Sequence, residues 1–333
     1  MYNKVAKTII NSKKICVIQA ENPDGDSLGS ALALEEILGD LGKEVGLYCP
    51  VAIPKYLRYA KGWDRVTDEF DFQSDLVIIV DTSSKTLLDK ALVPENLAHL
   101  KKIDVIVIDH HDTASDLPFP NGLVSNSSAV STSEVIYTLA KEQGWNVNST
   151  AAEQLLLALL SDSLGLSSEA VSSKSVRIVA DLLDSGASIS RIEAARREFM
   201  KKTRDILAYK GKLLERVEYH LDGQLATIHV PWEEIEKYSD QYNPGALVID
   251  EMRLVEGVKI AVVIKTYPDG KLTGKIRVNP EAKIAETVAQ YFGGGGHVYA
   301  AGFRVYETYE TILTELIQAT DKALEEYDAA QAT

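Results

Sequence analysis

Carboxylate and imidazole side chains stand repeatedly at the ends of apolar segments in the first half of the chain. They are Asp24, Asp26, Asp81, Asp109, His110, His111 and Asp162. Gathered at one place, so many carboxylates would repel one another strongly. Divalent cations relieve such repulsion, and a mixed set of oxygen and imidazole donors suits Mn²⁺, Mg²⁺ or a similar ion.

The elements that carry these side chains predict that they converge. Four nearly continuous apolar runs, 13–20, 44–49, 75–81 and 103–111, have the length and composition of buried strands. Helical spacing separates or follows them, at 27–41, 131–143, 151–160 and 172–185. This alternation predicts an α/β, doubly wound and mainly parallel sheet. Ligands of such sheets bind beyond the carboxyl ends of the strands, where the acidic residues would lie.

Each fragment also has an ordinary interpretation. Asp-Gly-Asp is a common turn, paired histidines are often surface residues, and an aspartate frequently follows an apolar strand. Their order and their shared sheet edge favour a metal site over these separate explanations. Two ions bridged by one carboxylate would lower the pKa of a bound water and clamp phosphate oxygens, which predicts phosphoester hydrolysis.

Bulk composition limits the possible partners. The 333 residues suffice for two domains, and 45% hydrophobic with 25% charged residues is typical of a globular protein. A net charge of −14 argues against broad binding of long nucleic acid. Neither a membrane span nor a signal peptide is expected. Cys16 and Cys49 form no pair motif, so a reduced, cytoplasmic protein is expected.

The pattern changes after a long charged helical stretch, 189–216, which we interpret as a helical linker. Segments 224–230, 258–267 and 271–278 then read as strands, and 282–291 and 306–327 as helices. These boundaries predict a metal-binding domain over 1–188 and a smaller α+β domain over 217–333.

A glycine run, Gly293, Gly294, Gly295 and Gly296, precedes His297. Glycines expose backbone N–H groups to an anion, and a helix starting after them would add its positive end. A flexible loop is the alternative, although four ordered glycines would carry a large entropic cost. Arg277 and His297 would supply further donors to a phosphate, although a lone strand arginine is more often a surface residue.

Six motifs together resemble a known family, the DHH phosphoesterases that carry a DHHA1 domain, and within it the nanoRNase and pAp-phosphatase group. The motifs are NPDGDSLGS (22–30), DTSS (81–84), DHH (109–111), SDS (161–163), GKIRV (274–278) and GGGGHVYAAGF (293–303). The resemblance covers nearly the whole chain. It implies a catalytic DHH domain, a substrate-binding DHHA1 domain and an active site in the cleft between them.

The resemblance also implies two divalent ions, of the Mn²⁺ type, with Mg²⁺ or Co²⁺ as alternatives. By position, Asp24 and Asp81 would hold one ion. The other would be held by Asp26, Asp81, His110 and Asp162, with Asp81 bridging.

The remaining motif residues would handle the substrate. His111 would contact the phosphate or assist the leaving group, and Asp109 would orient the histidines. Arg277, the glycines 293–296 and His297 would hold the terminal phosphate.

One departure from the family pattern bears on the metals. The family has a histidine four residues before its first aspartate, where this chain has Ala20. Glu21, Gln19 or water could replace that ligand, or the first ion could bind weakly. Val278, where the family often has a small polar residue, is a lesser departure.

The expected function is hydrolysis of short oligoribonucleotides, together with 3′-phosphoadenosine 5′-phosphate as a further substrate. One alternative is a phosphodiesterase of cyclic or linear dinucleotides. Another is a nucleotide-binding protein whose catalysis is impaired through Ala20. The glycine-rich second domain argues against an inorganic pyrophosphatase. The expected partners are a short oligonucleotide or small nucleotide, with neither a membrane nor long nucleic acid, and a homodimer is left open.

Overall fold

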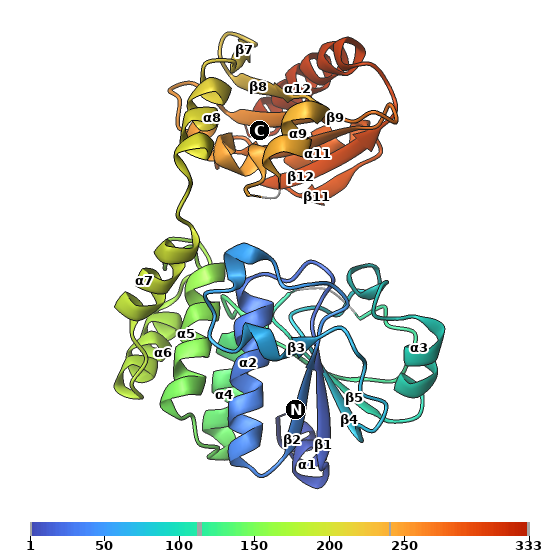
Figure 1. Cartoon of the computed structure of the whole chain (residues 1–333), viewed down its shortest axis with the longest axis vertical. Helices are drawn as coiled ribbons and strands as arrows, with labels where there is room; N and C mark the ends of the chain where they lie inside the picture. Colours follow the sequence, from blue (N-terminus) through green and yellow to red (C-terminus); the bar gives the residue numbers. More distant parts are fainter. Residues whose placement is uncertain (1, 112–114, 240, 332–333) are drawn as a thin grey trace. The chain divides into compact units, whose positions relative to one another are not determined.

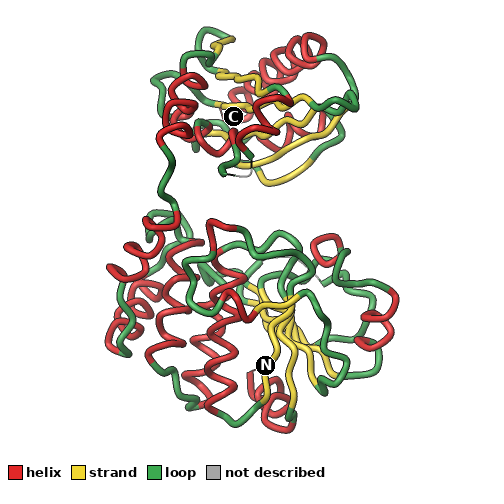
Figure 2. Tube along the Cα trace, viewed as in Figure 1, coloured by secondary structure: helices red, strands yellow, loops and turns green. Residues whose placement is uncertain are grey.

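The computed structural model describes residues 2–111, 115–239 and 241–331, without the side chain of His297. The chain forms two compact units, Met1–Lys201 and Lys202–Thr333 (Figure 1). Each unit has its own sheet and its own buried core. Helices and strands alternate along much of the first unit (Figure 2).

The first unit contains a six-stranded parallel sheet in the order β3-β2-β1-β4-β5-β6. Its strands are β1 (Lys14–Ile18), β2 (Glu44–Tyr48), β3 (Val66–Thr67), β4 (Leu76–Val80), β5 (Asp104–Asp109) and β6 (Gly122–Ser125). The chain winds outward from β1 in both directions, so the predicted doubly wound α/β architecture is confirmed. The short strands β3 and β6 lacked an apolar run and were not predicted.

Helices cover both faces of this sheet (Figure 1). They are α1 (Tyr2–Asn11), α2 (Gly25–Asp40), α3 (Pro94–Leu100), α4 (Thr132–Gln143), α5 (Ser149–Asp162), α6 (Ser173–Asp184) and α7 (Ile189–Phe199). Alternate residues of β1 serve the two cores: Ile15 and Val17 pack with α2, α4 and α5, whereas Cys16 and Ile18 pack on the side of α3. Burial on both faces explains why β1 is apolar throughout.

Helices α2 and α5 approach closely because α2 carries a glycine at the contact. A Cβ atom on Gly29 would lie 2.8 Å from both the carbonyl oxygen of Gln154 and the Cβ of Ala158. Asp26 lies one turn before Gly29 on α2, and Asp162 is the last residue of α5. The glycine contact therefore fixes two helices that each carry a carboxylate to the same site.

The second unit contains a mixed six-stranded sheet in the order β11-β12-β10-β9-β8-β7. Its strands are β7 (Glu218–His220), β8 (Leu225–Val230), β9 (Ile260–Thr266), β10 (Leu272–Val278), β11 (Gly295–His297) and β12 (Ala300–Val305). Within this second sheet, strands β8 and β9 pair in parallel, and the other pairs of described strands are antiparallel. Helices α11 (Ala285–Tyr291) and α12 (Tyr309–Gln331) pack on one face, and α8 (Arg204–Leu214), α9 (Trp232–Tyr238) and α10 (Ile249–Arg253) on the other.

The structure specifies two regions that the sequence left open, the helical linker and the glycine run. The stretch predicted as one helical linker, 189–216, forms two helices, because the Thr203 side chain accepts a hydrogen bond from the Ile206 amide and starts α8 anew. Helix α8 buries Ile206 and Leu213 in the core of the second unit. The glycine run leads into a strand, so no helix start adds its positive end there: residues 295–297 form β11, and the chain then turns into β12.

Single 3₁₀ turns complete the connections at η1 (Lys55–Leu57), η2 (Trp63–Arg65), η3 (Thr86–Leu88) and η4 (Pro244–Leu247). Within the described residues, every helix is too short or too polar to cross a membrane.

Candidate active site

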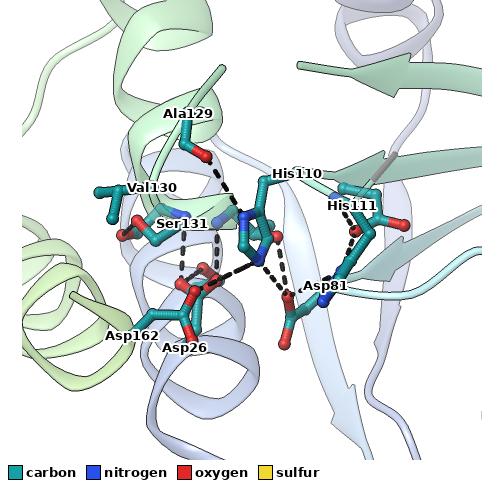
Figure 3. A network of polar contacts seen from close by, with 12 residues as sticks. Asp26, Asp81, His110, His111, Ala129, Val130, Ser131 and Asp162 are labelled. Atoms are coloured by element: carbon teal, nitrogen blue, oxygen red, sulfur yellow. Dashed lines mark hydrogen bonds and ion pairs between the residues drawn. The ribbon is translucent and has the colours of Figure 1, made fainter. Parts of the chain in front are cut away.

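Three neighbouring strands deliver the predicted acidic and imidazole residues to one edge of the first sheet. Strand β1 leads to Asp24 and Asp26, β4 to Asp81, and β5 to the segment 109–111. His110 lies at the centre (Figure 3). Its Nε2 is 3.3 Å from Asp162 Oδ2, 3.6 Å from Asp81 Oδ1 and 4.0 Å from Asp26 Oδ2. The predicted convergence at the strand ends is therefore present in the structure.

The first turn of α4 holds Asp26. The amide of Thr132 donates to Asp26 Oδ2 at 2.6 Å, and the amide of Ser133 donates to Oδ1 at 3.2 Å. The Ser30 hydroxyl adds a third bond to Oδ1 at 3.2 Å. A helix start offers such unpaired N–H groups. Burial raises the pKa of Asp26 despite the opposing effect of His110 and the Thr132 amide.

Asp81 is held in an unusual backbone conformation. Its φ of 63° lies in the left-handed region, which aspartate tolerates better than most residues. Its amide donates to the Ile108 carbonyl at 2.9 Å, and the Thr132 hydroxyl donates to its Oδ1 at 3.0 Å. Burial, followed by the charges of Asp26 and Asp24, raises its pKa well above the usual value. Thr132 was not predicted as a site residue, because the sequence shows only that a helix begins near residue 131.

His110 presents a buried ring nitrogen to these carboxylates. Its Nδ1 lies 3.3 Å from the Ala129 carbonyl, which favours the tautomer with the proton on Nδ1. Its Nε2 is buried and has no hydrogen-bond partner among the described residues. A buried nitrogen that faces carboxylates instead of donors is the expected arrangement of a metal ligand.

Two groups of donor atoms have metal-site dimensions within the described part of the chain. The first comprises Asp26, His110 and Asp162, and the second Asp81, His110 and His111, each with its atoms within 4.8 Å of one another. Burial, then the charges of Asp26 and Asp24, raises the pKa of Asp162 to about 7. A divalent cation would neutralise these crowded carboxylates, so the donor set fits a metal ion.

Asp24 and its neighbours lie outside both groups. Asp24 caps α2: its Oδ1 accepts from the Ser27 amide at 2.9 Å, and Ser27 Oγ accepts from the Asp24 amide at 3.0 Å. Glu21 Oε2 accepts from the Lys90 amide at 3.2 Å. Gln19 is fully buried, with both polar side-chain atoms unpartnered among the described residues. Glu21, one replacement considered for the ligand missing at Ala20, is therefore not grouped with the other donors.

Asp109 was expected to orient both histidines, but its described contacts position His111, while His110 Nδ1 lies against the Ala129 carbonyl. Asp109 Oδ1 lies 2.8 Å from His111 Nδ1 and also accepts from the His111 amide at 3.1 Å. This hydrogen bond raises the pKa of His111 despite burial. Burial alone would raise the pKa of Asp109, but its bonds to His111 outweigh burial and lower it. The His111 side chain is 43% exposed, so its ring can meet a ligand.

In the second unit, Arg277 lies on β10 and the end of the glycine run lies on β11, and strand β12 separates the two. Arg277 of β10 is opposite Ala300 of β12, which is in turn opposite His297 of β11. Burial lowers the pKa of the Arg277 guanidinium. The side chain of His297 is outside the described residues, so its predicted role is not tested by the geometry.

Two family models match the two units. Residues 14–161 match the N-terminal domain of the DHH family, and residues 234–327 match the DHHA1 domain. The chain therefore belongs to the DHH family, and it is a metal-dependent phosphoesterase with an attached DHHA1 domain.

Individual relatives are similar over most of their length. The chain is 24% identical to a bifunctional oligoribonuclease and PAP phosphatase of Bacillus subtilis over 321 residues, which cover 95% of this chain and 97% of the relative. It is 26% identical to the protein of the same name from Thermus thermophilus, covering 91% and 89%. An exopolyphosphatase-related protein of Bacteroides fragilis shares the fold, with a TM-score of 0.87, 21% identity and coverage of 98% and 97%.

Proposed function

We propose that this protein hydrolyses short oligoribonucleotides and removes a phosphate from 3′-phosphoadenosine 5′-phosphate. The observation that carries the proposal is the buried, unpartnered Nε2 of His110 among the carboxylates of Asp26, Asp81 and Asp162. Relatives named for both activities match nearly the whole chain, which supports this substrate class.

In this proposal Asp26, Asp81, His110 and Asp162 hold one divalent ion, of the Mn²⁺ type. Asp24 and Asp81 hold the second. When bound, such ions lower the pKa of a water molecule and neutralise charge on the phosphate. Asp81 is the residue common to both positions.

Protein groups around the ligands keep their oxygens and nitrogen in place. Thr132 serves two carboxylates at once, through its amide on Asp26 and its hydroxyl on Asp81. The Ala129 carbonyl keeps the His110 proton on Nδ1, leaving the Nε2 lone pair for metal binding. These fixed dipoles reduce the reorganisation needed during the reaction.

His111 would act on the substrate. Asp109 accepts the Nδ1 proton and raises the pKa of His111, which favours the doubly protonated ring; its Nε2 proton would then be the one donated to a phosphate oxygen or a leaving oxygen. In the second unit, Arg277, the glycines 293–296 and His297 would bind the terminal phosphate of the substrate. We further propose a cytoplasmic location, with Cys16 and Cys49 as free thiols. Measuring the mass of the protein in solution would decide whether it forms a homodimer.

The test is purified protein with Mn²⁺ on a panel of substrates. The panel contains an RNA dinucleotide, a pentanucleotide, a 24-residue RNA, 3′-phosphoadenosine 5′-phosphate, a linear dinucleotide signal and a cyclic dinucleotide. Hydrolysis of the short RNAs and the bisphosphate, with the long RNA spared, is the expected result. Preference for a cyclic dinucleotide would redirect the proposal to a signalling phosphodiesterase. Nucleotide binding without turnover would assign a binding protein instead.

A further inference from the structure

The segment 129–133, which leads into the first turn of α4, contacts three of the proposed metal ligands (Figure 3). The carbonyl of its first residue lies 3.3 Å from His110 Nδ1. The Thr132 amide donates to Asp26 at 2.6 Å, and the Thr132 hydroxyl donates to Asp81 at 3.0 Å. We call residues 129–133 the ligand clamp. Because the ligand clamp contacts several ligands, a shift of this segment would move several metal donors at once.

The next residue of α4, Glu134, has a buried carboxylate that is not itself a proposed ligand; the residue is 0% exposed. Its Oε2 accepts from the Val130 amide at 3.3 Å, inside the ligand clamp, and from the Ser175 hydroxyl at 3.0 Å. Its Oε1 lies 3.3 Å from Lys174 Nζ, an ion pair that does not have the geometry of a hydrogen bond. One buried carboxylate thus joins the ligand clamp to the first turn of α6.

The burial of the Glu134 charge needs a reason beyond packing. Glu134 lies in the first turn of α4 and its side chain reaches the first turn of α6, and helix starts favour a carboxylate. Burying a charge is still costly, and well-packed apolar residues often serve folding equally well at such positions. Two bonds that join separate segments next to a metal centre supply such a reason.

The start of α6 also leads back to the fourth proposed ligand. Asp162 is the last residue of α5, and the chain reaches α6 through the connection 163–172. Within this connection the Ser163 carbonyl accepts two amide hydrogen bonds, at 2.9 and 3.0 Å, which keep it compact. Glu134 therefore joins the segment that holds three ligands to the far end of the connection that leaves the fourth.

We propose that Glu134 is a positioning residue of the metal centre. Its carboxylate fixes the ligand clamp against the start of α6, and so keeps the oxygens of Asp26 and Asp81 and the Nε2 of His110 at separations that suit a divalent ion. This inference rests on the proposed function, in which these residues hold the metal. Removing the Glu134 carboxylate should leave every ligand present but less well placed.

Titration calorimetry with Mn²⁺, on the full chain without substrate, measures this role. Glu134→Met keeps the length of the side chain and removes both acceptor contacts, so it should weaken the tighter class of Mn²⁺ site about tenfold. Glu134→Gln keeps one oxygen that can accept from Val130 and Ser175, so it should bind Mn²⁺ within about twofold of wild type. Glu142→Met, at an exposed position of the same helix, is the matched control and should change nothing.

Ser175→Ala tests the contact with α6 by itself. It removes one bond to the Glu134 carboxylate and leaves the charge in place, so Mn²⁺ binding should weaken roughly three- to tenfold, the range of one hydrogen bond. Unfolding in EDTA is measured in parallel, because a residue needed only for folding would lower the stability of the metal-free protein without changing the Mn²⁺ affinity of its folded state. Should Glu134→Met fail to fold, Ser175→Ala decides the matter.

The outcomes separate this inference from the proposed function. Weaker Mn²⁺ binding in Glu134→Met and Ser175→Ala, with Glu134→Gln near wild type, supports it. Unchanged Mn²⁺ affinity in the first two variants overturns it. Equal weakening in Glu134→Met and Glu134→Gln, with Ser175→Ala unchanged, would show that the charge acts rather than its contacts, and overturns it as well. Absence of hydrolysis by the wild type, alongside the expected order of Mn²⁺ affinities, would overturn the proposed function and leave the positioning role standing.

Discussion

The Nε2 of His110 lies 3.3 Å from Oδ2 of Asp162, so the end of strand β5 meets the end of helix α5. These residues are far apart in sequence and come from different layers of the first unit (Figure 3). Apart from His110, Asp162 has no polar partner in the described structure that would explain its position. The relationship therefore points to metal binding rather than to folding.

Replacing Asp162 with Asn should separate these two roles. Asp162→Asn should weaken Mn²⁺ binding by about tenfold to a hundredfold. The rate of hydrolysis at a limiting Mn²⁺ concentration should fall with it. The metal-free variant should melt at or above the wild-type temperature, because one crowded carboxylate is gone. Isothermal titration with Mn²⁺ and thermal melts in EDTA measure these effects. Asp184→Asn, which makes the same charge change at the end of α6, should match wild type. Unchanged metal affinity in Asp162→Asn would contradict the proposed site.

Two substitutions of Asp81 separate the effect of its carboxylate charge on hydrolysis from the effect of its left-handed backbone conformation on stability. Asp81→Asn and Asp81→Ala should both abolish hydrolysis, because each removes the proposed bridging carboxylate. Asn tolerates the left-handed conformation and can still accept from Thr132, so its fold should persist with stability near wild type. Ala should cost about 1 kcal/mol more in the free energy of unfolding. Urea unfolding in EDTA measures the difference, and turnover surviving in either variant would exclude the two-metal mechanism.

The contact between α2 and α5 should control the site from a distance. Gly29→Ala would force a Cβ to within 2.8 Å of α5, which should destabilise the protein by about 1–3 kcal/mol. Displacing α2 from α5 should also weaken Mn²⁺ binding, since Asp26 and Asp162 lie on these helices. Gly39→Ala on the same helix meets nothing within 4 Å and should instead stabilise by about 0.5–1 kcal/mol. Equal stability of the two variants would show that the close approach is unimportant.

The sequence predicted the sheet and its acidic edge because both depend on local patterns. Apolar runs identified β1, β4 and β5, and an aspartate after a parallel strand must lie at the carboxyl edge. Thr132 could not be assigned, because its contact with Asp81 depends on how α4 packs against the sheet. Likewise, the periodicity of 189–216 continues across Thr203, and only the cap shows that a new helix starts there.

A salt bridge in the second unit should make stability depend on pH. Burial alone would raise the pKa of Glu234, but hydrogen bonds from Arg216 and Tyr209 outweigh burial and lower it. A carboxylate with a lowered folded pKa stabilises the protein above its unfolded pKa, and this contribution disappears as the pH falls through the folded value.

Glu234→Gln should therefore lower the free energy of unfolding by about 1 kcal/mol near neutral pH, allowing for solvent screening of a partly exposed pair. The difference from wild type should shrink as the pH falls below about 4. Urea unfolding from pH 7 to 3 measures it. Glu233→Gln, at the adjacent exposed position, should show no such pH-dependent difference. A constant gap between Glu234→Gln and wild type would contradict the electrostatic origin.

Ala20 provides the last test, because it probes a departure of this chain from its family. Glu21 is bonded to the Lys90 amide and Asp24 caps α2, so the first ion position has fewer free ligands than the position around His110. We expect two classes of Mn²⁺ site in wild type, the tighter one dependent on Asp162. Ala20→His should add a ligand and tighten the weaker class about tenfold, measured by titration calorimetry without substrate. Ala20→Ser is the matched small control. If Ala20→His leaves the weaker class unchanged while Asp162→Asn still removes the tighter one, the first ion is not held at the position that the family pattern implies.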